Sequence, residues 1–455
     1  MKTTVRAMAV AALALAIAVP AFAGEKTYVL SAARWGQDQE AAVRNAGGSV
    51  TYSHDGAGLG MVTSDAPDFA DRLRASGAFI SIDEDQVVQW QQPVNEVLLV
   101  DAAVNPNDDT FYTNVQWAPQ AVNAPAAWAA GYTGLGVRVA VLDGGIHSAH
   151  VDIAPNLDVA ASRSFVPGFA FNQDTGTFWH GTHVAGIVAA ADNTIGTVGI
   201  APEATIVGVK VLHAGSGSFG AVISGILYAA TSLAEGGGGA DIINMSLGSE
   251  FPRGGGNTGA GPLIAALNKA VNYADRFGVL VVSAAGNSAN DLDHTGSLIA
   301  VPAQSGSGIA ISATGPEGFG LGATNFRRMS SYTNYGNSAI YVAAPGGDFT
   351  LPGSALCTKL TSTGGPVTRP CWVFDMVLST ARGSGASVAS YAWAAGTSMA
   401  APAAAAVAAL IKQANPGISL GALKTKLAQS ADDEGKKGND PFYGRGFVNA
   451  QRAVQ

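Results

Sequence analysis

Charged side chains are scarce in this chain of 455 residues. Asp, Glu, Lys and Arg make up 13% of it, against about a quarter of a typical soluble domain, whereas Gly is abundant with 58 residues. The net charge is −8, and no run of Lys or Arg is dense enough to follow a phosphate backbone. The composition favours a tightly turned globular protein and argues against nucleic acid as a partner.

Apolar runs long enough to cross a membrane are also missing, since a span needs about 20 residues. The run AMAVAALALAIAVPA covers residues 7–21, and the shorter MAAPAAAAVAALI at 399–411 predicts a buried helix. The first run follows a basic head and precedes AFA, which is typical of a signal peptide at 1–23, cut after Ala23. A membrane anchor is the alternative. We expect an exported protein, secreted or periplasmic, without a membrane span in its mature form.

Cysteine occurs only twice, at Cys357 and Cys371. In an exported protein such a pair favours a disulfide over free thiols. Closing so short a loop stabilises a fold by about 3 kcal/mol in the chain-entropy treatment. We therefore predict a structural staple and not redox chemistry.

A small unit of alternating strands and helices precedes the main body of the chain. Strands are expected at 26–32, 49–56, 58–64 and 80–90, and helices at 38–48 and 66–76. This order predicts a compact α+β domain over 24–91. A connection that contains Pro, Asn and Asp, at 92–110, then separates it from residues 111–455.

Near-continuous β-branched runs follow, separated by helical stretches. The runs cover 137–143, 205–212, 240–247 and 278–286, and helices are expected at 220–234 and 261–278. Strands that are buried on both faces have this pattern. The sequence therefore predicts an α/β fold with a mostly parallel central sheet and helices on both faces. In such sheets, chemistry gathers at the carboxyl ends of the strands.

Four polar residues stand at the ends of these elements, and each has a plain structural interpretation. Asp143 ends a strand, where a helix cap or a ribose-binding carboxylate would fit. The glycines at 134–136 precede that strand, so they do not form a phosphate-binding loop. His180 and His183 share a helix face and could be half of a metal site. Ser398 begins an apolar helix, where a capping serine is common, but a base oriented by a third group would make it a nucleophile.

These residues lie in motifs that resemble those of the subtilisin-like serine peptidases, the subtilases. The motifs are AVLDGGIHSAHVDI at 140–153, HGTHVAGIVAA at 180–190, INMSLGS at 243–249, SAAGN at 283–287, GTSMAAP at 396–402 and GRGFVNAQRAV at 444–454. They follow the family's order, with Asp, His and Ser in the chain order of subtilisin. The resemblance reaches almost to the end of the chain.

The resemblance implies a secreted serine endopeptidase that forms an acyl-enzyme. Asp143 would orient His180, His180 would be the general base and Ser398 the nucleophile. The side-chain amide of Asn287 and the backbone N–H of Ser398 would hold the oxyanion, and losing such a donor costs about 3–4 kcal/mol, a magnitude measured in subtilisin. A metal site would need a further ligand, and the glutamate of HExxH is absent. His183 is then expected to be structural, hydrogen-bonding within its helix.

The resemblance also implies where a substrate lies. In this family a peptide pairs as an added strand with two backbone segments, beside the wall of the main specificity pocket. The segments would be Gly215, Ser216, Gly217 and Ser246, Leu247, Gly248, and the wall Ala284, Ala285, Gly286, with Ala300 near its base. We expect no acid placed to hold a basic side chain. A preference for large apolar or aromatic residues before the scissile bond follows.

A calcium loop is implied at 190–199, where the sequence is AADNTIGTVG. The ligands would be the side-chain amide of Asn193, the backbone carbonyls of Ala191, Ile195 and Thr197, the carboxylate of Asp152 and an oxygen of Gln116. An all-oxygen set without thiolates fits Ca²⁺. A solvated turn containing Asn is the alternative. No organic cofactor is implied, and a monomer is expected.

The unit at 24–91 resembles the propeptide of these enzymes, an intramolecular folding aid and inhibitor. Its tail near Gln91 would lie in the active site. The linker at 92–110 leaves the maturation cut open between Gln91 and a bond near Asp109. An insertion at 351–391, which carries both cysteines, is expected to shape either the primed or the unprimed rim of the cleft.

Two other classes of protein compete with this interpretation. A non-catalytic subtilase-like binding module is one, although competent residues fill all four active-site positions. An α/β-hydrolase esterase is the other, but it would carry its nucleophile in GxSxG and order its partners Ser, Asp, His. This chain has GTSMA and the reverse order.

Overall fold

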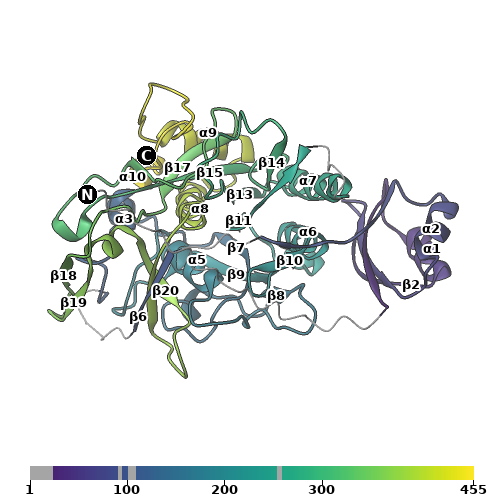
Figure 1. Cartoon of the computed structure of the whole chain (residues 1–455), viewed down its shortest axis with the longest axis horizontal. Coiled ribbons are helices and arrows are strands. Elements are labelled where there is room, and N and C mark those ends of the chain that lie inside the picture. The colour runs from purple at the N-terminus through teal and green to yellow at the C-terminus, as the bar shows by residue number, and fades with distance from the viewer. Residues whose placement is uncertain (1–23, 91–94, 101–108, 254–258) are drawn as a thin grey trace, which may run out of the picture.

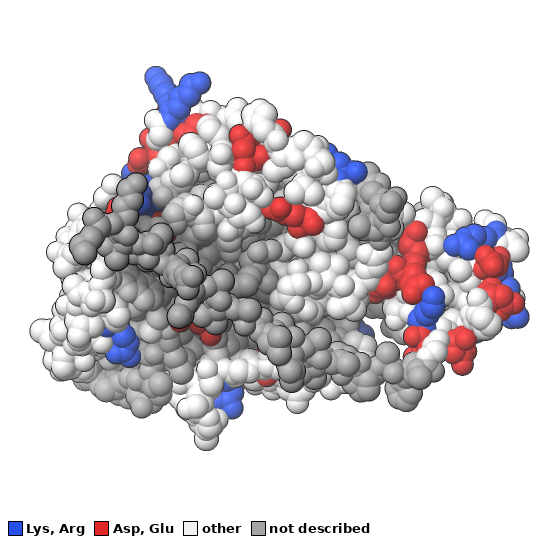
Figure 2. Space-filling view, in the orientation of Figure 1, with Lys and Arg blue, Asp and Glu red and all other residues white. Residues whose placement is uncertain are grey.

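The computed structural model describes residues 24–90, 95–100, 109–253 and 259–455. The expected signal peptide, Gln91 and part of the expected linker lie outside the described residues. Figure 1 shows a small domain, drawn in purple, docked on one side of a large body. In Figure 2 charged side chains gather on the small domain, whereas the described part of the body carries only scattered charges on this face.

The small domain is an antiparallel sheet with two helices. The strand order is β2 (Gly48–His54), β3 (Leu59–Ser64), β1 (Lys26–Ser31) and β4 (Ser81–Glu84), and the helices are α1 (Gln37–Ala46) and α2 (Phe69–Ser76). A core that includes Leu30, Val43 and Phe69 fills the space between the sheet and the helices. The alternation of apolar residues along the strands accounts for this sandwich.

The prediction of a single strand over 80–90 is wrong, because the chain leaves the small sheet after β4. Oδ1 of Asp85 accepts from the backbone N–H of Gly220 at 3.0 Å, in the first turn of α6 (Phe219–Ala230). An acid at a helix N-terminus is favoured by the unpaired N–H groups there. The next strand, β5 (Val87–Gln89), pairs antiparallel with β10 (Ser216–Ser218) of the large body.

The central sheet of the body comprises eight strands within the described residues. Their order is β16 (Arg328–Met329), β15 (Ile309–Gly315), β13 (Leu280–Ala284), β11 (Ile242–Met245), β7 (Arg138–Asp143), β9 (Thr205–Lys210) and β8 (Arg163–Ser164), with β17 (Ile340–Pro345) also paired to β15. All pairs are parallel except β15 with β16. The predicted α/β fold with a mostly parallel sheet is confirmed.

Helices cover both faces of this sheet, and β7 shows why. Val139 and Val141 belong to the core beneath α5 (His180–Ala189) and α8 (Thr397–Ala414). Ala140 and Leu142 point into the other core, beneath α6 and α7 (Ala260–Arg276). Successive side chains of a strand point to opposite faces, so an apolar strand without alternation requires cover on both sides. No helix in the described part of the chain is long and apolar enough to cross a membrane.

The insertion at 351–391 forms a hairpin and part of a second small sheet. The hairpin is β18 (Leu356–Leu360) with β19 (Pro366–Pro370), and the sheet joins β20 (Val377–Ala381), β21 (Ser390–Ala395) and β6 (Asn95–Val100). The predicted disulfide is present, with Sγ atoms of Cys357 and Cys371 2.04 Å apart. Because β21 runs directly into α8, the insertion stands beside Ser398.

Candidate active site

The topology brings three predicted residues to the carboxyl edge of the sheet. Asp143 is the last residue of β7, His180 the first of α5 and Ser398 the second of α8. Nδ1 of His180 lies 2.8 Å from Oδ2 of Asp143. The exposed fractions of these two side chains are 6% and 1%. A short hydrogen bond between an imidazole and a carboxylate is strong where both side chains are shielded from water.

His180 is a base whose affinity for a proton is set by two opposing effects. Burial disfavours the charged imidazolium, but the carboxylate of Asp143, with smaller contributions from Asp174 and Glu96, outweighs it, and the pKa of His180 is raised above its ordinary value. Among the described residues, no atom is a hydrogen-bond partner of Nε2. That nitrogen is the one a serine hydroxyl would use.

Gly144 and Lys210 lie close to the carboxylate of Asp143. Its Oδ1 accepts from the backbone N–H of Gly144 at 2.6 Å. The ammonium of Lys210, 1% exposed, donates to the backbone carbonyls of Gly144 and Leu212. Burial lowers the pKa of Lys210 to about 8, although Asp174 and Asp143 act in the opposite direction. Lys210 was not predicted as a site residue; its only signal was a lone Lys inside an apolar strand.

Ser398 is held by its backbone at the start of α8. Oγ of Ser246 donates to the backbone carbonyl of Ser398 at 2.7 Å, and Nδ2 of Asn244 donates to Oγ of Ser246 at 3.0 Å. Oγ of Ser398 points toward the backbone carbonyl of Ser246 at 3.4 Å. Its contact is long, so the hydroxyl is free to rotate toward an acceptor.

The amide of Asn287 has one orientation imposed on it. Oδ1 accepts from the backbone N–H and the hydroxyl of Thr397 at 2.9 and 2.8 Å. Since an N–H can only donate, the oxygen must face Thr397 and Nδ2 faces the other way. Gly286, at φ +104°, precedes this residue, and a Cβ there would lie 2.4 Å from Nδ2 of Asn334. A glycine is therefore required.

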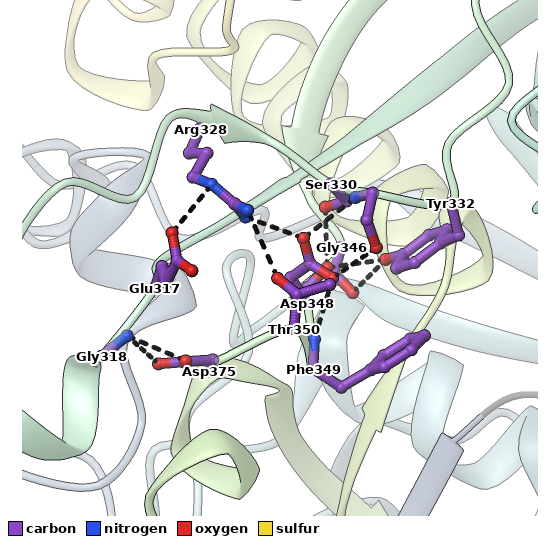
Figure 3. Close-up of polar contacts among 12 residues, drawn as sticks. Glu317, Gly318, Arg328, Ser330, Tyr332, Gly346, Asp348, Phe349, Thr350 and Asp375 are labelled. Carbon is purple, nitrogen blue, oxygen red and sulfur yellow. Dashed lines mark hydrogen bonds and ion pairs between the residues drawn. The ribbon is translucent and has the colours of Figure 1, made fainter. Parts of the chain in front are cut away.

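A buried polar network fixes the turn behind Ser398 (Figure 3). The hydroxyl of Tyr332 donates to the backbone carbonyl of Gly346 at 2.9 Å, and the same carbonyl accepts from the N–H of Gly396 at 3.0 Å. Asp348, 1% exposed, accepts from Arg328 at 2.9 Å. No short sequence motif indicates Arg328, Tyr332, Gly346 or Asp348.

The two predicted backbone segments are paired with the tail of the small domain. Ser216 is opposite Gln89 and Gly217 opposite Val88. The N–H of Trp90 donates to the carbonyl of Gly215 at 3.0 Å, and the carbonyl of Trp90 accepts from the N–H of Gly248 at 2.8 Å. The indole of Trp90 is fully buried and contacts the rings of Phe219 and Phe251.

A pocket opens beside Ser398, with small residues in its wall. The residues that line it are Trp90, Leu247, Gly248, Ser249, Glu250, Ala284, Ala285, Gly286, Asn287, Ser288, Ala300, Val301, Ala303, Asn334, Thr397 and Ser398. The expectation of no acid in this wall is wrong, because Glu250 lies in it and accepts from Nδ2 of Asn290 at 2.9 Å. Pairing of β12 (Ser249–Pro252) with β14 (Leu298–Val301) brings Glu250 opposite Ala300, a long-range contact that sequence reasoning did not provide.

His183 has a partner outside its own helix, contrary to expectation. Its Nε2 donates to the backbone carbonyl of Ala392 in β21 at 2.9 Å. Burial lowers its pKa to about 3, so the ring is neutral. His183 therefore ties α5 to the strand that leads to Ser398.

The loop at 191–197 surrounds buried carboxylates. Oδ2 of Asp152 accepts from the N–H of Thr197 at 3.1 Å, and Oδ1 from Nδ2 of Asn193 at 3.4 Å. Asp109, expected in the linker, is buried here instead and accepts from the N–H of Ile195 at 3.0 Å. Burial and the neighbouring Asp192 raise the pKa of Asp109 to about 7.

The amide side chains of Gln116 and Asn193 are less suited to binding a cation than the carboxylates of this region. Both atoms of the Gln116 amide pair with the backbone of Val198, at 2.8 and 3.1 Å. The amide nitrogen of Asn193 faces Asp152, while its oxygen accepts from the N–H of Ile195 at 3.1 Å. The backbone of Ala191 donates to the carbonyl of Asp152 at 2.8 Å. Within the described ranges, no three His, Cys, Asp or Glu side chains converge as metal ligands.

An Asp–His pair at the carboxyl edge of a parallel sheet, with a serine at the start of a helix that packs on that sheet, is the arrangement of a serine hydrolase of the subtilisin-like fold. The subtilase family pattern matches residues 134–446. M-protease of Shouchella clausii is 37% identical over 349 residues, which are 76% of this chain and 71% of that protein. Subtilisin Savinase of Lederbergia lenta is 37% identical over 345 residues, 75% of this chain and 99% of that protein.

A solved protease structure from Pseudoalteromonas arctica is similar with a TM-score of 0.57 and 29% identity, over 76% of this chain and 98% of that chain. The chain belongs to the subtilase family, and it is a serine endopeptidase.

The pH dependence of activity should report the pKa of His180. A general base works only when neutral, so activity is lost as the pH falls through that pKa. Because the pKa of His180 is raised, this acid limb lies above that of an ordinary imidazole. In Asp143→Asn, burial acts without the opposing carboxylate, so the acid limb should move below its wild-type position. The value of kcat should also fall by about 10⁴. The measurement is kcat/KM from about pH 5 to pH 9. An unmoved acid limb in Asp143→Asn would contradict the pairing.

Proposed function

We propose that this chain is an exported serine endopeptidase that activates itself by removing its N-terminal domain. The observation that carries the proposal is the 2.8 Å contact between His180 and Asp143 at the end of β7, together with a pocket that Ser398 and Asn287 line. Residues 1–23 would direct export, and the released enzyme would act on polypeptides as a monomer. These roles agree with the family to which the chain belongs.

The proposed reaction has two halves that use the same groups. Oγ of Ser398 attacks the carbonyl carbon of the scissile bond while Nε2 of His180 takes the hydroxyl proton. Nδ2 of Asn287 and the N–H of Ser398 stabilise the oxyanion. When the C–N bond breaks, His180 returns the proton to the leaving amine. Water then repeats the sequence on the acyl-enzyme and restores Ser398.

The described strands on either side of residues 91–94 support self-processing near this point. Trp90 lies on β10 and Gly248, and β6 begins at Asn95 beside β21, which leads to Ser398. We propose that the cut falls between Trp90 and Asn95, close to the Gln91 alternative. A bond near Asp109 is a poorer substrate, because that residue is buried in the peptidase body. The small domain would remain bound as an inhibitor until it is degraded.

Self-processing can be tested by the intact mass of the exported protein. Wild type should lose the region 24–91, and Ser398→Ala should keep it, because the mutant lacks the nucleophile. Asn287→Ala should lose it more slowly by roughly 10²–10³-fold. If wild type and Ser398→Ala both keep the region, a non-catalytic binding module gains support. If both lose it, another protease makes the cut, and Ser398 must be judged by peptide hydrolysis.

The pocket beside Ser398 supports a preference for large apolar residues before the scissile bond. Alanines and Val301 make up much of its wall, and such surfaces favour apolar side chains. The carboxylate of Glu250 is engaged by Asn290, which reduces its attraction for a cation. We therefore expect Glu250 to affect the preference for the residue before the scissile bond less than the apolar wall does.

Peptides that differ only in the residue before the cut should rank Phe above Lys by about 10–100-fold in kcat/KM. Glu250→Gln removes the charge with little change of shape, so it should leave cleavage after Phe unchanged and further lower cleavage after Lys. Equal cleavage after Phe and Lys in wild type, with Lys alone lost in Glu250→Gln, would show instead that Glu250 sets a basic preference.

The loop at 191–197 supports a calcium site with a modified ligand set. Asp109 and Asp152 bring two buried carboxylates together, and neighbouring like charges are relieved by a bound cation. The backbone carbonyls of Ala191, Ile195 and Thr197 and the amide of Asn193 would add oxygens after local rearrangement. Gln116 is replaced by Asp109 in this proposal, since its amide is taken by Val198.

Chelation should therefore destabilise the mature enzyme, tested after its serine has been blocked by an organophosphorus reagent. We expect EDTA to lower Tm by about 5 °C, because a ligand that binds only the folded state stabilises it. Ca²⁺, but not Mg²⁺, should restore the original value. Asp152→Asn should lose the response, and the exposed Asp433→Asn should keep it. The same Tm for wild type with and without EDTA would rule out a stabilising calcium.

A further inference from the structure

Lys210 is a buried cation beside the Asp143–His180 pair, and the proposed reaction does not use it. β9 is the neighbour of β7 in the central sheet (Figure 1), and Lys210, the last residue of β9, is opposite Asp143 in the strand register. Its ammonium donates to the backbone carbonyl of Gly144 and to that of Leu212. A lysine is almost never fully buried unless other groups compensate its charge.

The turn that this ammonium holds packs directly on α5. A Cβ on Gly181 would lie 2.6 Å from the carbonyl oxygen of Gly145 and 2.9 Å from Cβ of Asp143. Gly181 therefore allows the helix to touch the turn. Because Gly181 follows His180, the residues after Asp143 connect the acid to the helix that carries the imidazole.

Asp174 brings a second carboxylate to the same turn. A Cβ on Gly144 would collide with Oδ2 of Asp174, so the carboxylate occupies the space that a side chain at position 144 would fill. Its Oδ1 accepts from the backbone N–H of Ala214 at 3.0 Å and from that of Thr175 at 2.9 Å. The side chain of Asp174 is 6% exposed. This acid is therefore fixed against the residue that follows Asp143.

His213 lies between the cation and the second acid. Its Nδ1 is 3.4 Å from Nζ of Lys210 and 3.6 Å from Oδ1 of Asp174, and its ring stacks on Phe169 with the centroids 3.7 Å apart. An ammonium can only donate, so Nδ1 of the imidazole accepts and carries no proton. Burial and the charge of Lys210 lower the pKa of His213. The ring is therefore neutral, and it adds no charge to the pair.

The charges around His180 come from several elements of the fold. Burial lowers the pKa of His180, and acids on three segments raise it: Asp143 in β7, Asp174 in the loop before α5 and Glu96 in β6. Within α5, burial lowers the pKa of His183 to about 3, so that ring is neutral. Burial lowers the pKa of Lys210 to about 8 against the effect of Asp174 and Asp143, so its ammonium is still charged at neutral pH.

We propose that Lys210 and Asp174 are positioning residues of the reaction, a pair of opposite charges that fixes the turn after Asp143 and balances the electrostatic field on His180. Asp174 favours the imidazolium that forms when Ser398 attacks, and Lys210 favours the ionised form of Asp143. This deepens the proposed function, and it rests on the proposed role of His180 as general base.

Removal of either charge should move the titration of His180, and the two directions should differ. Asp174→Asn keeps the shape and removes a negative charge, so the pKa of His180 should fall. Lys210→Gln keeps an N–H donor for the carbonyl of Gly144 and removes a positive charge, so the pKa should rise. Each shift should be roughly half a pH unit. In the double variant the two shifts should cancel, which loss of packing alone would not produce.

The test is an NMR titration of the uncut Ser398→Ala protein with isotope-labelled histidine. The resonance of His180 is identified by its absence from His180→Gln. Asp174→Asn, Lys210→Gln and the double variant are compared with Asp433→Asn, which removes an exposed acid and should leave the titration unchanged. Because Ser398→Ala lacks the nucleophile, this measurement does not depend on activity.

The same substitutions in the mature enzyme give a second readout. The acid limb of kcat/KM should move to lower pH in Asp174→Asn and to higher pH in Lys210→Gln, and KM should not change.

Shifts of the same sign, no shift, a double variant that stays away from the wild-type value or an unmoved acid limb would each overturn the proposal. Asp174→Asn is isosteric, so it decides the matter even where Lys210→Gln does not fold. If the NMR shifts are present but wild type hydrolyses no peptide, the proposed function fails, and the role of the two charges in the reaction fails with it.

Discussion

A hydrogen bond between Nδ1 of His180 and the carboxylate of Asp143, buried almost completely, joins the central sheet to the helices that cover it. The carboxylate of Asp143 contacts His180 and accepts from the backbone N–H of Gly144, and the ammonium of Lys210 lies nearby. Removing water from this edge requires α5 and α8 to pack closely on β7. The runs of alanine in α8 and the glycines of α5 allow that approach.

Two sheet edges of the body are paired with strands from the N-terminal part of the chain. Strands offer unpaired backbone groups wherever a sheet ends. In this structure β10 is paired with β5, and β21 with β6, so the chain lies on both sides of Ser398. Strand addition, the way in which the family resemblance implies that substrates bind, is also the way in which β5 and β6 lie on the body.

Support for Ser398 comes from residues far away in sequence. Thr397 orients Asn287, Ser246 holds the carbonyl of Ser398, and the Tyr332 network holds the turn before it. These contacts hold Asn287 and Ser398 in a fixed relation, which is what the proposed stabilisation of an oxyanion requires. Each of these contacts is a hydrogen bond to a backbone group and not an ion pair.

Strong local signals in the sequence were enough to predict the four apolar runs that form β7, β9, β11 and β13, the helices between them and the disulfide. Motif order also indicated Asp143, His180 and Ser398, since each stands at an element end. Tertiary structure alone settled that the 80–90 run divides, that Glu250 enters the pocket, that Asp109 is buried beside the 191–197 loop and that β6 lies on β21. Each of these depends on a pairing between distant residues, and local propensity contains no information about which distant partner wins.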